Sequence, residues 1–260
     1  MEECLRLESV DVCYGQKQVL KNISFSLRTR EILGIVGESG SGKSTIVRAV
    51  LGILGQGGMI DRGDIWFEGK NLPDLPEKEM RRIRGAKIGM IFQNAASALC
   101  PIRTIESQIY ESMAAHQKIT RKEASKQALA LFEKLGFSDG QRILKSYPFE
   151  LSGGMNQRVG IAVATLMNPS VLLADEPTSA LDVAVQKQVL DEMLLLRKLY
   201  GTAIILVTHD IGVISAMADT VLVLKEGRIV EYGSTETVLK NPKEEYTSEL
   251  LAAVPRLRRK

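Results

Sequence analysis

The sequence predicts an α/β fold: a core with a mainly parallel sheet, an N-terminal antiparallel β subdomain and an inserted helical subdomain. Three observations indicate this class. Short, continuous apolar runs recur along the chain, and most precede a glycine-rich or polar turn and a helical pattern. The first 31 residues instead alternate between apolar and polar side chains. Between residue 94 and about residue 167 the strand signals stop, and helical patterns replace them.

The N-terminal segment has the apolar spacing of half-buried strands. Its apolar positions are Leu5, Leu7, Val10, Val19, Leu20, Ile23, Phe25 and Leu27. The four continuous runs that follow cover residues 32–36, 88–92, 171–174 and 203–207. Because such runs are typical of strands buried on both faces of a parallel sheet, we expect them to form the core. A strand at 228–232 and a helix near 245–252 complete the expected elements.

The helical segment contains one helix with clear start and stop signals. Thr120 is followed three residues later by Glu123, which is the pattern of a capping box, and Gly136 is placed to end the helix. Apolar residues between them recur on one face. We therefore expect a single domain over residues 1–260, with a core of about 1–93 and 168–260 and a helical insertion of about 94–167.

Composition excludes several classes of protein. The chain has 34 Lys and Arg against 31 Asp and Glu, a formal charge of +3, which does not indicate a nucleic-acid partner. A hydrophobic content of 45% excludes a disordered chain. Its 3 Cys are too scattered for a disulfide framework, and 2 His do not predict a His-rich metal site. We see neither a signal peptide nor an apolar segment of the ~18 residues that cross a membrane.

The strongest motif follows the first apolar run. It has the spacing of a P-loop, a glycine followed after four residues by Gly-Lys-Ser, between a strand and an amphipathic helix. Its glycines let backbone N–H groups surround phosphate oxygens, Lys43 supplies a positive charge, and the Ser44 hydroxyl can bind Mg²⁺. The sequence therefore predicts a P-loop NTPase core. The candidate nucleotide-binding residues here are Gly37, Glu38, Ser39, Gly40, Ser41, Gly42, Lys43, Ser44 and Thr45.

A pair of acidic residues ends the third apolar run. Asp175 and Glu176 follow residues 171–174, and a carboxylate at the end of a buried strand is costly unless a cation meets it. Asp175 suits a role facing Mg²⁺. Glu176 beside it is the candidate general base that activates water.

A second candidate anion site lies at residues 151–155, with the sequence LSGGM. Ser152, Gly153 and Gly154 open a helix, so a hydroxyl, free N–H groups and the helix dipole converge there. Taken alone, the same residues are more often those of an ordinary capped helix. Two phosphate-binding helix starts in one chain require an explanation.

The set of motifs resembles the ATP-binding subunits of ABC transporters. Residues 151–155 are similar to the signature motif of that family, and the other motifs match in the right order over about residues 4–252. Tyr14 resembles the aromatic residue that stacks on adenine. Gln93 resembles the glutamine of the Q-loop, residues 179–182 with Asp182 resemble the D-loop, and His209 resembles the switch histidine. Asp182 is also placed to cap the helix that follows it.

This resemblance implies an ATPase in which two subunits enclose two ATP molecules between the P-loop of one and the signature motif of the other. It implies Glu176, His209 and Gln93 as catalytic residues, and Mg²⁺ held through ATP by Ser44, Gln93 and Asp175. The implied partners are a second ATP-binding subunit, homologous or identical, two transmembrane permease subunits and, indirectly, an extracytoplasmic substrate-binding protein. The implied location is peripheral, at the cytoplasmic face of the inner membrane.

Finer similarities point to the dipeptide, oligopeptide and nickel branch of importers. Residues 142–155 resemble the first ATP-binding subunit of nickel and metal-chelate importers, and residues 238–251 are similar to the ending of the branch. Residues 94–103, where coupling to the permease is expected, match the branch only loosely. We therefore expect import of nickel or a nickel chelate. The alternatives are a dipeptide, oligopeptide or opine importer, a soluble complex of the same family, and a scaffold with a vestigial site.

Overall fold

The computed structural model describes residues 2–179 and 181–253, and the chain divides into two compact units. Unit 1 comprises Met1–Pro76 and Ala203–Lys260, and unit 2 comprises Glu77–Thr202. The helical insertion expected at about 94–167 falls within unit 2. Residue 180 of the predicted D-loop lies outside the described residues.

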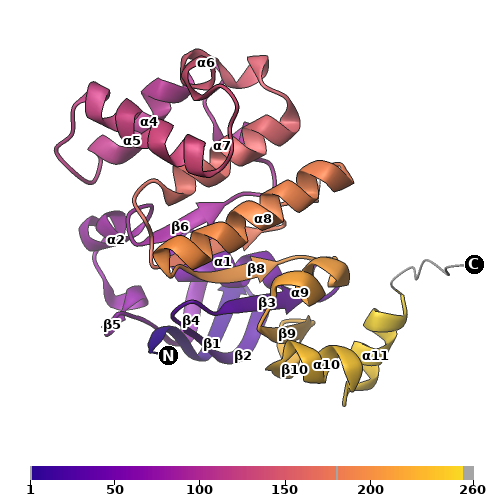
Figure 1. Ribbon diagram of the computed structural model, residues 1–260. Helices are drawn as coiled ribbons and strands as arrows, with labels where there is room; N and C mark the ends of the chain where they lie inside the picture. Colours follow the sequence, from indigo (N-terminus) through magenta and orange to yellow (C-terminus); the bar gives the residue numbers. More distant parts are fainter. Residues whose placement is uncertain (1, 180, 254–260) are drawn as a thin grey trace, which may run out of the picture. The chain divides into compact units, whose positions relative to one another are not determined.

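Unit 1 begins with an antiparallel sheet in the strand order β2-β1-β4-β5 (Figure 1). Its strands are β1 (Glu3–Tyr14), β2 (Lys17–Arg28), β4 (Gly58–Phe67) and β5 (Lys70–Asn71). β1 and β2 confirm the predicted strands of the N-terminal segment. All of the predicted apolar positions are buried except Val19, which is partly exposed. β4 was not predicted. Most of its residues are at least partly exposed, so it lacks a continuous apolar run.

The second group of strands in unit 1 holds two of the four predicted core runs and one strand, β9, that was not predicted. β3 (Ile32–Val36) lies parallel to both β8 (Ala203–Val207) and β9 (Thr220–Lys225), and β10 (Arg228–Ser234) pairs with β9 in the antiparallel sense. Every residue of β3 and β8 is buried, as expected for strands covered on both faces. The helices of unit 1 are α1 (Lys43–Leu51), the 3₁₀ turn η1 (Leu72–Asp74), α9 (Ile211–Met217), α10 (Thr235–Lys240) and α11 (Glu245–Ala252).

Unit 2 contains a parallel pair of strands, β6 (Ile88–Ile91) and β7 (Val171–Asp175), and a group of helices. The helices are α2 (Glu77–Ile83), α3 (Ala95–Ala98), α4 (Ile105–Ala114), α5 (Arg121–Lys134), α6 (Gly140–Lys145), the 3₁₀ turn η2 (Pro148–Glu150), α7 (Gly153–Thr165) and α8 (Val183–Tyr200). α4, α5 and α6 pack together, and α5 also contacts α7 (Figure 1). These contacts bury Ile109, Met113, Ala128 and Phe132.

The ends of α5 and the end of β6 were both predicted from the sequence of unit 2. The capping box of Thr120 and Glu123 is present at the start of α5, and Gly136 has φ 71 just after its end. β6 ends at Ile91, one residue earlier than predicted, and Phe92 is 43% exposed. The end of β6 places Phe92 and Gln93 in the loop that follows the strand.

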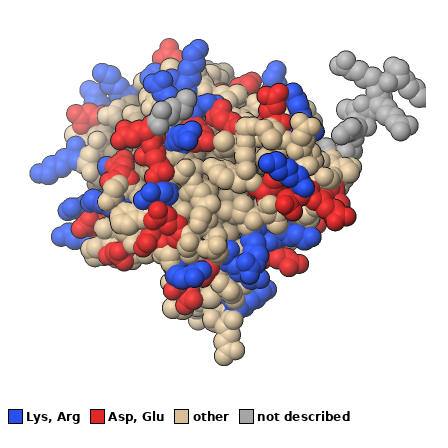
Figure 2. Space-filling view, turned by 90° about the horizontal axis from the view of Figure 1, so that it is seen from below, with Lys and Arg blue, Asp and Glu red and all other residues tan. Residues whose placement is uncertain are grey.

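Surface charge is balanced locally on the face drawn in Figure 2. Lys and Arg side chains lie among Asp and Glu side chains there, with uncharged surface between them (Figure 2). Among the helices of the described residues, none combines the length and the apolar character needed to cross a bilayer.

Candidate nucleotide-binding and hydrolysis site

The P-loop, residues 37–44, joins the end of β3 to the start of α1 in unit 1. Three of its glycines have positive φ: 153° at Gly37, 81° at Gly40 and 108° at Gly42. A side chain at Gly37 would place its Cβ 2.1 Å from the carbonyl oxygen of Leu224, so only glycine fits there. Gly42 is the N-cap of α1, and its carbonyl accepts the backbone N–H of Thr45 at 3.0 Å. The loop thus delivers the chain into a helix N-terminus that favours anions.

Lys43 lies inside this loop. Its side chain is only 6% exposed, and its Nζ donates to the carbonyl oxygens of Gly37 and Glu38, both at 2.8 Å. The ammonium group therefore sits in the concave side of the P-loop, the side that surrounds a phosphate in this motif. Its burial is compatible with a positive charge because two carbonyl dipoles face it.

The Ser41 hydroxyl supports the same interpretation. Its oxygen is buried and has no hydrogen-bond partner among the residues that the structure describes. A buried polar atom without a partner is costly, and a bound acceptor would satisfy it. Phosphate oxygens are such acceptors, so the P-loop residues fit a nucleotide phosphate.

A tyrosine outside the predicted motifs fixes the P-loop from the side. The backbone N–H of Glu38 donates to the hydroxyl oxygen of Tyr246 on α11 at 3.2 Å. The Lys225 ammonium lies 4.4 Å from the centre of the Tyr246 ring, in position for a cation–π contact. Burial raises the pKa of the Tyr246 phenol, which keeps it in the neutral form. The last described helix of the chain is therefore tied to the P-loop.

Tyr246→Phe is expected to weaken ATP binding about two- to tenfold, because one neutral hydrogen bond that orders the loop is worth about 0.5–1.5 kcal/mol. The measurement is a titration of the purified chain with a fluorescent ATP analogue. Tyr232→Phe is the matched control, since the Tyr232 hydroxyl also bonds the backbone, donating to the carbonyl of Ser26 elsewhere in unit 1. Equal affinities for the two variants would contradict a role for Tyr246 in ordering the loop.

Two further predicted residues lie in unit 1. His209 is exposed and follows β8, whose C-terminal end lies beside that of β3 in the parallel register Ile35↔Val207. It thus lies at the same edge of the strands as the P-loop. Tyr14 ends β1, partly exposed, where its pairing partner on β4 is Gly58.

In unit 2, the structure brings Gln93 and Glu176 together. The Gln93 Nε2 lies 3.4 Å from the Glu176 Oε2 and 3.3 Å from the Ser179 Oγ. β6 and β7 are parallel, with Ile91 opposite Ala174, so the residues after each strand meet at one edge. The acidic pair and the predicted Q-loop glutamine are therefore neighbours although 83 positions separate them in the chain.

Glu176 has a backbone conformation that is uncommon for its type. Its φ is 47°, in the left-handed region that non-glycine residues seldom adopt. The chain turns here directly after the buried Asp175, and the Ser179 N–H donates to the Glu176 carbonyl at 3.3 Å. Strain of this kind, about 1–3 kcal/mol, is concentrated at functional sites. In this conformation the Glu176 Oε2 lies 3.4 Å from the Gln93 Nε2.

The predicted signature segment forms a capped helix start in unit 2. Ser152 is the N-cap of α7 and accepts the Met155 N–H at 3.3 Å. Nothing lies within 4 Å of where a Cβ on Gly153 would stand, whereas a Cβ on Gly154 would lie 2.7 Å from Val185 of α8. Gly153 therefore faces open space, and Gly154 permits close packing against α8. Asp182 caps that helix by accepting the N–H groups of Ala184 and Val185, both at 3.0 Å.

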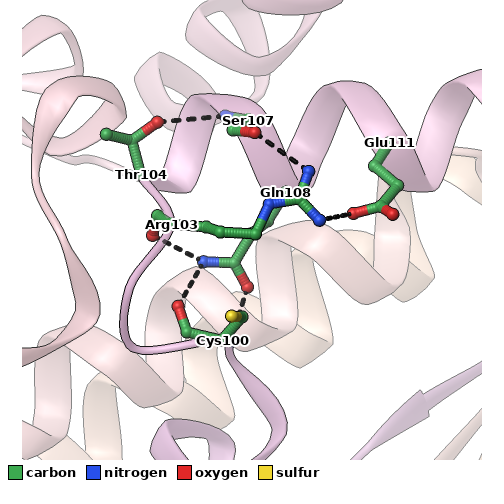
Figure 3. Close-up of polar contacts among 6 residues, drawn as sticks. All are labelled: Cys100, Arg103, Thr104, Ser107, Gln108 and Glu111. Atoms are coloured by element: carbon green, nitrogen blue, oxygen red, sulfur yellow. Dashed lines mark hydrogen bonds and ion pairs between the residues drawn. The ribbon is translucent and has the colours of Figure 1, made fainter.

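The segment after Gln93 has an order that the sequence did not indicate. The amide of Gln108, on α4, accepts the Cys100 N–H at 2.7 Å and donates to the carbonyls of Cys100 and Arg103 (Figure 3). Arg103 also forms an ion pair with Glu111 (Figure 3). These contacts hold a loop whose tip, Ile102, is 81% exposed.

The candidate residues are thus divided between the two units. Unit 1 carries Tyr14, the P-loop residues 37–45 and His209, and unit 2 carries Gln93, Ser152–Gly154, Asp175, Glu176 and Asp182. Within the described residues, no group of three or more His, Cys, Asp or Glu side chains is placed to hold a metal ion by itself. Asp175 is buried at 9% exposure at the end of β7.

Comparisons with known proteins give a consistent result. A family model described as "ABC transporter" matches residues 20–179. The oligopeptide transport ATP-binding protein OppD of Bacillus subtilis (strain 168) is 44% identical over 244 residues, which cover 94% of this chain and 68% of OppD. The dipeptide transport ATP-binding protein DppD of the same organism is 40% identical over 262 residues, covering 99% of this chain and 78% of DppD.

A solved structure is similar as well. It is described as a dimeric, post-hydrolysis state of the ATP-binding cassette MJ0796 bound to ADP and Pi. The similarity has a TM-score of 0.77 and 29% sequence identity, and it covers 89% of this chain and 98% of that one.

Proposed function

Because this chain belongs to the ABC transporter family and is an ABC-type ATPase, we propose that it is the ATP-hydrolysing subunit of an importer whose cargo is a small peptide. The observation that carries the proposal is the similarity to OppD and DppD, which are named for oligopeptide and dipeptide transport and match over nearly the whole chain. The phosphate-shaped P-loop and the Gln93–Glu176 pair support the hydrolytic part.

In this proposal, the P-loop binds the phosphates of ATP, and Tyr14 stacks on the adenine. Glu176 accepts a proton from the attacking water, and His209 contacts the γ-phosphate. Ser44, Gln93 and Asp175 would hold Mg²⁺, which when bound neutralises charge on the phosphates. The Gln93 amide donates a hydrogen bond to the Glu176 carboxylate and thereby orients the carboxylate.

The second half of each site comes from a partner subunit. The helix N-terminus at Ser152, Gly153 and Gly154 has open space beside Gly153. This space suits a nucleotide bound to a second ATP-binding subunit, identical or homologous. In the same arrangement, Asp182 belongs to the nucleotide-binding residues. The dimeric cassette bound to ADP and Pi supports this arrangement by likeness. We place the chain at the cytoplasmic face of the inner membrane, where two permease subunits hold it. An extracytoplasmic binding protein delivers the substrate to those permease subunits. The exposed Ile102 on its ordered loop is our candidate contact with a permease.

The cargo is where the comparisons change the sequence-based expectation. Residues 142–155 favoured nickel, whereas OppD and DppD are named for peptides. Peptide import was the alternative in the sequence analysis, and it is now the first proposal.

The test is transport by the complete complex in proteoliposomes. We expect ATP-dependent uptake of radiolabelled di- to pentapeptides and none of radioactive Ni²⁺, with the Glu176→Gln complex as the inactive control. Uptake of Ni²⁺ or a nickel chelate without peptide uptake would contradict the peptide proposal and support nickel as the cargo. ATP hydrolysis that responds to neither would overturn the importer proposal in both forms.

A further inference from the structure

The buried side-chain amide of Gln157 on α7 forms hydrogen bonds to both ends of the loop that carries Gln93. The side chain of Gln157 is 4% exposed. Its Oε1 accepts the backbone N–H of Ala95 at 3.1 Å, and its Nε2 donates to the carbonyl oxygen of Phe92 at 3.1 Å. The two backbone groups lie on either side of Gln93 and Asn94, so one side chain fixes both ends of this short loop.

Close packing also holds this loop against α7. α3 begins at Ala95 and packs on α7, and a Cβ built on Gly160 of α7 would stand only 2.6 Å from the Ala95 Cβ. The absence of a side chain at Gly160 lets the two helices approach each other. As a result, the loop of residues 92–95 is attached to α7 by two hydrogen bonds and a close contact, and it is expected to move with that helix.

We propose that Gln157 is a positioning residue for hydrolysis: it holds the Gln93 loop so that the Gln93 amide stays at the Glu176 carboxylate. This inference rests on the proposed function, in which Glu176 is the general base. α7 begins beside Ser152, about 7.5 Å along the helix axis from Gln157 at 1.5 Å per residue.

α7 has anchors other than Gln157. Arg158, 6% exposed, forms an ion pair with Glu192 of α8, donates to the Leu135 carbonyl at 2.7 Å and lies 4.0 Å from the centre of the Phe137 ring. These contacts anchor α7 to α8 and to the end of α5. Loss of the Gln157 amide is therefore expected to release the Gln93 loop while α7 stays folded.

The test compares Gln157→Leu, which removes both hydrogen bonds at similar volume, with Gln127→Leu on the exposed face of α5. We expect Gln157→Leu to lower kcat for ATP about tenfold with KM unchanged, since each of two lost hydrogen bonds contributes modestly. Hydrogen–deuterium exchange is expected to accelerate in peptides spanning residues 92–98 and not in α7. Gln127→Leu is expected to match the wild type in both measurements. If Gln157→Leu fails to fold, Gln157→Glu replaces it, because it keeps the acceptor for Ala95 and loses the donor to Phe92.

A double-mutant cycle with Gln93→Ala separates positioning from general stability. If Gln157 acts through Gln93, the double variant loses no more activity than Gln93→Ala alone in single-turnover hydrolysis. Additive losses, or faster exchange in 92–98 with a wild-type kcat, would overturn the proposal. A lower kcat in Gln157→Leu without faster exchange in 92–98 would overturn it too. Failure of the proposed function itself would instead show as wild-type turnover in Glu176→Gln.

Discussion

Glu176→Gln is expected to lower kcat for ATP hydrolysis by about 10²–10⁴-fold, the usual contribution of a general base. The substitution removes the carboxylate that accepts a proton from water and nearly preserves its shape. A glutamine at 176 can still face the Gln93 amide, 3.4 Å away in the structure, and ATP affinity is expected to stay within about twofold of wild type because the P-loop lies elsewhere in the chain. Single-turnover hydrolysis and equilibrium ATP binding measure the two quantities separately.

Glu226→Gln is the matched control for this substitution. Glu226 also has a positive φ, 46° against 47° at Glu176, and it lies on an exposed turn between β9 and β10. A glutamine at either position carries the same backbone strain, so the control isolates the loss of the carboxylate at Glu176. We expect wild-type kcat for Glu226→Gln. Turnover above about half of wild type in Glu176→Gln would exclude Glu176 as the base, since a general base contributes far more.

Sequence alone predicts the strands β3, β6, β7 and β8 from their continuous apolar runs, together with the functional residues that follow them. β3 and β8 were predicted with their observed bounds, because a continuous apolar run is typical of a strand that is buried on both faces of a parallel sheet. α5 was predicted from its capping box. β4 was missed because its residues alternate between exposed and partly buried, and its pairing with β1 is long-range. Burial alone does not make a strand recognisable, because residues 221–224 of β9 are buried and β9 was not predicted either.

The candidate site shows the same division. The P-loop, Asp175, Glu176, Gln93 and the signature segment were recognised as motifs, because their chemistry lies within a few neighbouring residues. Gln157 and Tyr246 were not recognised, since their partners are 62 and 65 positions away for Gln157 and 208 for Tyr246. One signal for Gln157 was available: a glutamine next to the apolar run of its helix, where a buried amide requires partners. Tyr246 had no such signal, because a half-polar aromatic residue near a chain end is common.

Ser152→Arg is expected to abolish ATP-dependent dimerisation while leaving ATP binding by the single chain intact. Ser152 is exposed at the N-cap of α7, and its oxygen accepts the Met155 N–H. An arginine therefore has room outside the fold and costs unit 2 little beyond the cap, about 0.5–2 kcal/mol. In the proposed sandwich, the same side chain fills the space beside Gly153 that the partner's nucleotide would occupy. Hydrolysis in the complete complex is expected to fall about a hundredfold, comparable to loss of an essential group that stabilises the transition state.

Ser234→Arg separates the loss of a cap from the loss of the sandwich. Ser234 is the N-cap of α10 in unit 1 and accepts the Thr237 N–H at 3.3 Å, as Ser152 does with Met155. Both variants lose an equivalent cap, but only Ser152→Arg places a bulky cation at the proposed half-site. In a Glu176→Gln background, which preserves bound ATP, the Ser234 variant is expected to form an ATP-dependent dimer by analytical ultracentrifugation, and the Ser152 variant to remain monomeric. Dimers of both variants would mean that the start of α7 does not receive a partner's nucleotide, because an arginine at its N-cap leaves no space for one.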